Sequence, residues 1–126
     1  MKIAANIVGA LLGLAFIAFS LMILLNLVHA PPPPEGTMAS DFMKAFAPSG
    51  WLHFVKSFEL IGGILVAIPK TRNFGLLILG PIIINILAFH VFVTQGADVF
   101  PVPAVLAALA LFLLWVERRS FLNLLH

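Results

Sequence analysis

Long apolar stretches separated by short polar connections dominate the pattern of the chain. The first covers residues 3–30 without a charged side chain, and three more cover 51–69, 74–94 and 99–116. Each has roughly the 20 residues, or more, that an α-helix needs to cross a hydrocarbon core about 30 Å thick. The sequence contains no alternating polar and apolar segment of about ten residues, the pattern that is typical of a barrel strand. The pattern therefore predicts an all-α membrane protein, a four-transmembrane-helix bundle in which residues 1–126 form a single membrane domain.

The first stretch also allows a second interpretation, a secretory signal peptide. Lys2 supplies a basic start, and Val28-His29-Ala30 resembles a small-residue cleavage site. The apolar core is longer than the roughly 7 to 15 residues of a signal peptide, and we expect Pro31 directly after the cleavage position to disfavour processing. We therefore predict a retained anchor.

The connection over residues 31–50 carries a pattern of its own. It opens with four prolines, which predict a stiff polyproline-type spacer. Ser40 is a candidate cap for a short helix. In that helix Phe42, Met43 and Phe46 lie near one side, so we expect it to lie along the membrane interface. Two roles stay open for it, a lid that packs on the bundle and a gate over a pocket.

Composition excludes several classes of protein. Hydrophobic residues make up 62% of the chain and charged residues 10%, against roughly 25% charged in soluble domains. A small soluble enzyme has no interior large enough for so much apolar surface. The chain contains no cysteine, which excludes disulfides, thiolate metal sites and a cysteine nucleophile. Its seven Lys and Arg residues are too few and too scattered for nucleic-acid binding.

The basic residues outside the predicted spans indicate the orientation. Those at the two termini and in the second connection are Lys2, Lys70, Arg72, Arg118 and Arg119. The first and third connections together hold Lys44 as their one basic residue. The positive-inside rule then places both termini in the cytoplasm and residues 31–50 in an outer loop. For a bacterial chain this predicts a multi-pass protein of the cytoplasmic (inner) membrane.

Polar side chains interrupt the second and third apolar spans, and five of them, leaving out Ser57, are the candidate ligand-binding residues. His53, Lys56 and Glu59 lie in the second span, and Asn85 and His90 lie in the third. A charge near the bilayer centre costs about 2.5 to 3.5 kcal/mol, so we expect these groups to turn inward. At about 1.5 Å per residue, Glu59 and Asn85 share a level near the midplane and the others stack toward the outer face. The sequence therefore predicts a polar pocket in the outer half of the bundle.

Other interpretations of these residues remain open. Lys56 and Glu59 share a helix face and are predicted to form an ion pair, which could serve only to fix the register of the bundle. Three histidines, His29, His53 and His90, are candidate metal or haem ligands, but they lack ligand-type spacing such as HxxxH. We expect no metal site. The sequence contains no phosphate-binding loop and no Ser/His/Asp set, so no motif predicts catalysis by this chain alone.

Small residues recur at a spacing that favours close helix contact. Gly9 and Gly13 form a GxxxG pair, and Gly63 with Ala67 repeats the spacing in the second span. Packing within one bundle and dimerisation are both compatible with the motif. We favour packing within the bundle.

Two segments of the second and third spans resemble a known family. The segment KSFELIGGIL (56–65) and the segment GPIIINILAFHVF (80–92) resemble the DoxX-like family of small four-helix membrane proteins. The family is functionally diverse. Its namesake is a membrane subunit of an archaeal thiosulfate:quinone oxidoreductase, and other members are linked to oxidative-stress complexes or to chaperoning of membrane partners. The resemblance implies that Lys56, Glu59, Asn85 and His90 match the polar core of the family.

The leading hypothesis is therefore a DoxX-like accessory protein whose pocket binds a lipophilic ligand such as a quinone. Lys56 or His90 would donate a hydrogen bond to a carbonyl oxygen, Glu59 would set protonation and Asn85 would orient the ligand. Any redox reaction would then occur with the chain as a membrane subunit of an oxidoreductase. The alternative is a structural or assembly subunit of a larger membrane complex or homo-oligomer, without ligand chemistry. A transporter or proton channel is a third hypothesis, which no inverted repeat supports.

Overall fold

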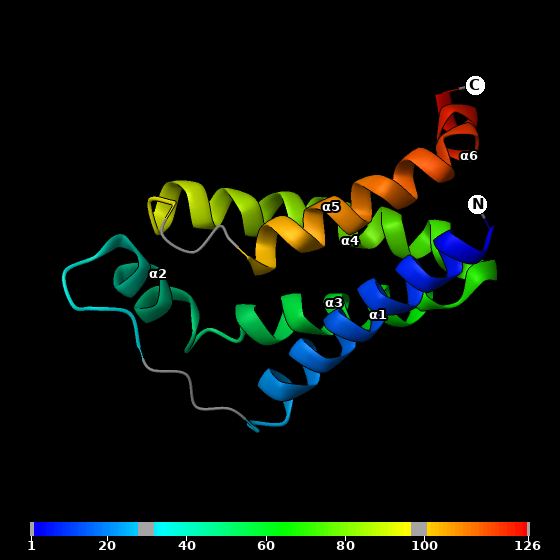
Figure 1. Cartoon of the computed structure of the whole chain (residues 1–126). Coiled ribbons are helices and arrows are strands. Elements are labelled where there is room, and N and C mark those ends of the chain that lie inside the picture. Colours follow the sequence, from blue (N-terminus) through cyan, green and yellow to red (C-terminus); the bar gives the residue numbers. More distant parts are fainter. Residues whose placement is uncertain (1, 28–31, 97–100, 126) are drawn as a thin grey trace.

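The computed structural model describes residues 2–27, 32–96 and 101–125, which form helices and connections without any strand (Figure 1). The α-helices are α1 (Lys2–Leu24), α2 (Met38–Phe46), α3 (Trp51–Ala67), α4 (Arg72–Ala88), α5 (Val102–Val116) and α6 (Arg118–Leu122). Shorter helical segments are η1 (Pro69–Thr71), η2 (Phe89–Val93) and η3 (Asn123–Leu125). The predicted all-α fold is confirmed.

Four helices pack side by side. α1 packs on α3, α3 on α4, α4 on α5, and α5 returns to α1. The start of α1, the start of α4 and the short α6 lie at one end of the molecule, here called the terminal end (Figure 1). Helix α2 lies at the opposite end, here called the α2 end (Figure 1). The two ends therefore differ in the connections and termini that they carry.

The helix lengths are compatible with an integral membrane protein. Two helical stretches are long and apolar enough to cross a membrane, Lys2–Leu24 and Pro69–Val93. A third is possible if α2 and α3, which meet at a bend of 89°, form one span. Helix α5 is apolar but shorter, with 15 residues. By length and composition the described helices thus provide two or three candidate spans.

Several helix bounds differ from those expected. The first helix, predicted over 3–30, ends at Leu24, and the chain turns at Asn26 with a φ of 54°. Asn tolerates this left-handed conformation better than most residues, so it can stop a helix inside an apolar run. The second helix ends at Ala67, before Pro69 opens a short 3₁₀ turn. The proposed cleavage site at 28–30, like the start of the fourth predicted span, lies outside the described residues.

The short helix expected in the first connection is present as α2. Its N-cap is Thr37 and not Ser40, because the Thr37 hydroxyl oxygen accepts a hydrogen bond from the Ser40 backbone N–H at 3.2 Å. Ser40 itself lies in the first turn of the helix. Gly50 then adopts a φ of 84°, a conformation that glycine reaches without strain, and lets the chain bend into α3.

Apolar side chains fill the core and also cover much of the surface. Large apolar side chains such as Ile84 and Leu111 are more than 60% exposed, whereas Ser20, Glu59 and Arg72 are buried. Exposed apolar atoms on all sides of a helical bundle suit contact with lipid. Glu59 and Arg72 have hydrogen-bond partners within the bundle, whereas the buried Ser20 hydroxyl has none among the described residues.

Small residues bring α1 and α3 into close contact. A Cβ atom added at Gly13 would lie 2.5 Å from the Gly63 carbonyl oxygen and 2.7 Å from the Ala67 Cβ. Gly9 lies opposite Val66 in the same way, so residue numbers fall along α3 as they rise along α1 and the two helices are antiparallel. The predicted use of these glycines for packing within one bundle is confirmed.

Candidate functional site

A cavity of about 620 Å³ opens between α2, α3, α4 and η2. Four of the five predicted site residues line it, namely Lys56, Glu59, Asn85 and His90. Apolar side chains from the same elements complete its wall: Phe42, Met43, Trp51, Leu52, Val55, Ile82, Ile86, Ala88, Phe89, Phe92 and Val93. The cavity thus combines an apolar wall with a small group of converging polar groups, as ligand pockets commonly do.

Lys56 and Glu59 form the charged part of the cavity. The Lys56 Nζ lies 3.3 Å from Glu59 Oε1, which confirms the predicted ion pair. The Glu59 side chain is 4% exposed and that of Lys56 20%. Both stand on α3 three residues apart, so the pair lies within one helix and needs no residue of another helix. Because the charges cancel, the pair offers a ligand donors and acceptors without a net charge.

Asn85 and His90 also line the cavity, from the neighbouring helix. His90 is half-buried, whereas Asn85 is exposed and does not turn inward as expected. Asn85 lies on α4, and His90 lies in η2, where the helix widens into a π-turn. In this turn the Thr94 N–H donates to the Phe89 carbonyl oxygen at 3.1 Å, and the Thr94 hydroxyl donates to the His90 carbonyl oxygen at 2.8 Å. Such π-turns are frequent at functional sites because one extra residue redirects the side chains that follow.

The imidazole of His90 has an unmet hydrogen-bonding group. Its Nδ1 atom is buried and has no hydrogen-bond partner among the described residues. The ring edge packs on the Phe89 ring, with the two centroids 5.4 Å apart. A buried polar atom without a partner costs about 1 to 3 kcal/mol, which a ligand atom within reach would recover.

Aromatic rings from helix α2 meet rings of α3 and η2 beside the cavity. The Phe42 ring centroid lies 5.5 Å from that of Trp51 and 4.9 Å from that of Phe89. Phe46 adds a contact to Trp51 at 5.1 Å. These four residues, here called the aromatic cluster, join α2 to the start of α3 and to η2. Sequence analysis placed Phe42 and Phe46 on one side of a helix but had no signal for their partners. A gating role for α2 stays a prediction.

His53 is not part of the cavity. It is exposed and does not line the cavity, although it lies three residues from Lys56. Each residue turns the helix by about 100°, so Lys56 lies about 60° from Glu59 around α3 and His53 about 120° from it. The polar stripe therefore turns away from the cavity before it reaches His53.

The histidines weighed as candidate metal ligands are not gathered into a metal centre within the described residues. No three His, Asp, Glu or Cys side chains there lie together so that they could hold an ion. His29, which completed the candidate set, lies outside the described residues.

Arg72 is a buried residue whose role sequence analysis missed. It was taken as a topology marker, yet it is 4% exposed. Its Nη2 donates a hydrogen bond to Asn6 Oδ1 of α1 at 3.0 Å, and its Nε donates to the Val66 carbonyl oxygen at 3.4 Å. Gly9 leaves the space for its guanidinium. A signal was present, because Arg72 shares the helical spacing of the buried residues Gly75, Leu76, Leu79 and Ile83.

Comparison with known proteins gives one distant relative. The Bacillus subtilis (strain 168) protein named "Uncharacterized protein YwoB" is 30% identical over 97 residues, which is 74% of this chain. The chain spans 62% of the length of that protein. No family model matches the chain. No solved structure matches it either.

Proposed function

We propose that this chain is a four-helix membrane protein of the DoxX-like type that binds a lipophilic ligand with a carbonyl head, such as a quinone. In this proposal α1, α3, α4 and α5 all cross the bilayer, with α5 as the shortest span. The chain then acts as an accessory subunit, and redox chemistry occurs with a partner oxidoreductase. The observation that carries the proposal is the convergence of Lys56, Glu59, Asn85 and His90 on one largely apolar cavity.

The orientation proposed for the bundle has both termini in the cytoplasm of a bacterial cell. The terminal end carries Lys2, Lys70, Arg118 and Arg119 on α1, η1 and α6 (Figure 1). The α2 end carries Glu35, Asp41 and Lys44 among the described residues, with an exposed ion pair of 3.1 Å between Lys44 and Glu35. This asymmetry supports a cytoplasmic terminal end. A reporter fused within residues 32–37 should be active outside the cytoplasm, and cytoplasmic activity would reverse the orientation.

The residues present fit a quinone head. The cavity volume of about 620 Å³ falls within the range of roughly 300 to 1,000 Å³ typical of small-molecule sites. Lys56 Nζ can donate to one carbonyl oxygen, and His90 Nδ1 has no partner within the described residues. A bound quinone supplies reversible uptake of electrons and protons at its two carbonyl oxygens. The chain itself binds the head, orients it through Asn85 and excludes water with the aromatic cluster.

Binding can be measured through Trp51, whose indole lines the cavity. In a Trp115→Phe background, Trp51 is the single tryptophan. Titration of the detergent-purified protein with a short-chain benzoquinone should quench its fluorescence to saturation. Extraction of the natively purified protein should also release a quinone. No saturable quenching and no extracted quinone would overturn the proposal.

A matched pair of variants tests the site within this assay. Asn85→Leu removes a polar group that lines the cavity and should weaken binding about tenfold, the effect of losing one well-placed hydrogen bond. His53→Leu also replaces an exposed polar side chain by leucine, but outside the cavity, and should leave binding unchanged. Equal effects of the two variants would assign the quenching to non-specific partition.

The alternative, a structural or assembly subunit of a larger complex or homo-oligomer, makes a different prediction for the same preparation. It expects a stoichiometric protein partner, no bound small molecule, and a Lys56–Glu59 pair that matters for stability alone. Purification in a mild detergent with analysis of both protein and lipid content separates the two proposals.

A further inference from the structure

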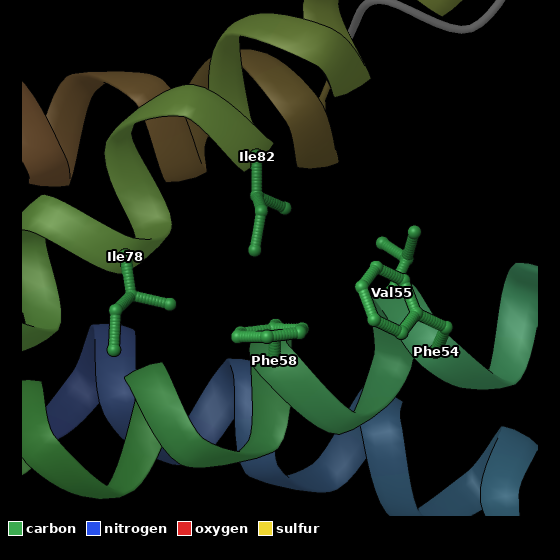
Figure 2. Close-up of a pocket in the computed structure, with 5 residues that line it drawn as sticks. All are labelled: Phe54, Val55, Phe58, Ile78 and Ile82. Carbon is green, nitrogen blue, oxygen red and sulfur yellow. The ribbon is translucent and has the colours of Figure 1, made fainter.

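A second hollow lies beside the cavity on the surface between α3 and α4. This hollow, here called the notch, has a volume of about 260 Å³. It is lined by Phe54, Val55, Phe58, Ile78 and Ile82. Figure 2 shows Ile78 and Ile82 extending from α4 toward the side chains of Phe58, Phe54 and Val55 on α3. All five lining side chains are hydrocarbon. The notch therefore offers no hydrogen bond to a polar ligand.

The notch and the cavity are neighbours that share part of their wall. Val55 and Ile82 line both of them. Along α4, Ile78, Ile82 and Ile86 follow each other at four-residue intervals and form one stripe that passes Asn85. The distance along the helix from Ile78 to Asn85 is about 10 Å. A molecule with its head beside Asn85 can therefore extend along this stripe into the notch.

The other side of the cavity is less suited to an apolar chain. At the α2 end the aromatic cluster borders the cavity, and its helix α2 also carries exposed charged residues, Asp41 and Lys44. The notch instead adjoins exposed rings, because Phe54 is 61% exposed and Phe58 41% exposed. These rings face the lipid if the helices cross a bilayer as proposed.

We propose that the ligand of the cavity is an amphiphile with one hydrocarbon chain, and that this chain leaves the cavity sideways through the notch between α3 and α4. The inference rests on the proposed binding function and adds the shape of the ligand and its direction. Head and chain occupy separate surfaces, with the head held by the polar groups and the chain held by packing alone. Ligand exchange then occurs directly with the membrane, without passage through water.

The lipid or detergent around the notch limits which perturbation can test the exit of the chain. Lipid and detergent tails are as apolar as the notch, so the notch gives a chain little hydrophobic gain over its surroundings. A longer chain is therefore not expected to bind much more tightly. Obstruction of the notch is the sharper perturbation, because a chain forced against a bulky side chain must bend or withdraw.

The experiment compares two probes on the wild-type protein and two variants, with isothermal titration calorimetry as the readout, because each variant adds a tryptophan and its fluorescence would no longer report on Trp51 alone. One probe is a methoxybenzoquinone head without a chain, and the other is the same head with a decyl chain. Ile78→Trp should weaken the decyl probe about tenfold or more and leave the head probe within about twofold. The control Leu77→Trp places the same ring on an exposed position of α4 that lines neither hollow, and should change neither affinity.

The outcomes separate the two proposals. If the wild-type protein binds neither probe, the proposed function fails and this inference fails with it. If both probes bind and Ile78→Trp affects them equally or not at all, the binding function stands and the sideways exit is wrong. Retained binding of the head probe also verifies that the variant is folded, and Ile78→Phe serves as a smaller obstruction if it is not.

A second measurement needs no variant. A decyl probe with a photoreactive diazirine at the chain end should label peptides of the wild-type protein that contain Phe58 or Ile78. Labels confined to α2 would place the chain at the opposite exit and overturn the inference.

Discussion

Gly13 of α1 provides the most direct test of how the bundle is held together. A Cβ atom there would lie 2.5 Å from the Gly63 carbonyl oxygen and 2.7 Å from the Ala67 Cβ. Ordinary van der Waals contact begins at 3.4 Å. Neither neighbour can rotate away, because one is a backbone atom and the other is fixed to its backbone. A side chain at position 13 must therefore push α1 and α3 apart.

The size of the effect follows from two opposing terms. In Gly13→Ala, better helix propensity raises the free energy of unfolding by about 0.5 to 1 kcal/mol. Overpacking the tight contact lowers it by about 1 to 3 kcal/mol. We expect a net loss of about 1 to 2 kcal/mol in the free energy of unfolding. Gly13→Val should cost more, about 3 kcal/mol, because its methyl groups add to the same clash.

The assay is unfolding by SDS in mixed micelles, followed by tryptophan fluorescence and by helix content. The control is Ala18→Val, a change to the same residue at an exposed position of the same helix. It should shift the free energy of unfolding by no more than about 0.5 kcal/mol. If Gly13→Ala is as stable as the wild-type protein, or if it changes only the oligomeric state, the contact between α1 and α3 is not what Gly13 provides.

Three further predictions follow from the buried polar groups and from α2. Lys56→Met should lower the free energy of unfolding by about 3 kcal/mol, because it leaves the buried Glu59 without its partner, and adding Glu59→Gln should restore much of the loss in the same SDS titration. Asn6→Ala should lower the free energy of unfolding by about 1.5 to 3 kcal/mol, because it removes an acceptor from the buried Arg72. Asn6→Asp keeps an acceptor and should not destabilise the protein. Equal stability of both variants would contradict the role of Asn6 as the partner of Arg72. Phe42→Ala should shift Trp51 emission to longer wavelength in a Trp115→Phe background, because Trp51 loses one of its ring contacts, and Phe54→Ala, whose ring packs on Phe58, should not.

Much of the local structure could be predicted from the sequence because it depends on neighbours along the chain. Apolar runs of about 20 residues predict helices whatever surrounds them. The Lys56–Glu59 pair forms within one helix turn, so its spacing was sufficient to predict it. The short helix in the first connection was predicted by its own pattern, although its cap proved to be Thr37.

The composition of the site needed more than spacing. Lys56 and His53 are as close in sequence as Lys56 and Glu59, yet His53 lies outside the cavity. Whether a residue of α3 lines the cavity depends on which side of α3 faces α2, α4 and η2, and spacing along one helix does not give that side. His90 reaches the cavity from a π-turn, whose extra residue no periodicity of period 3.6 predicts.

What the sequence by itself determined is the four long helices, the short helix of the first connection, the polar residues within the spans and the ion pair. Each follows from short-range geometry and from the cost of polar groups among apolar ones. Only the tertiary structure decided which of these polar residues meet, that Arg72 is buried against Asn6, and that Phe42 of α2 packs on Phe89 beside the cavity. These contacts join residues far apart in the chain. The register between α1 and α3 depends on how closely Gly13 and Gly63 approach each other, and that distance is a property of two surfaces rather than of either segment.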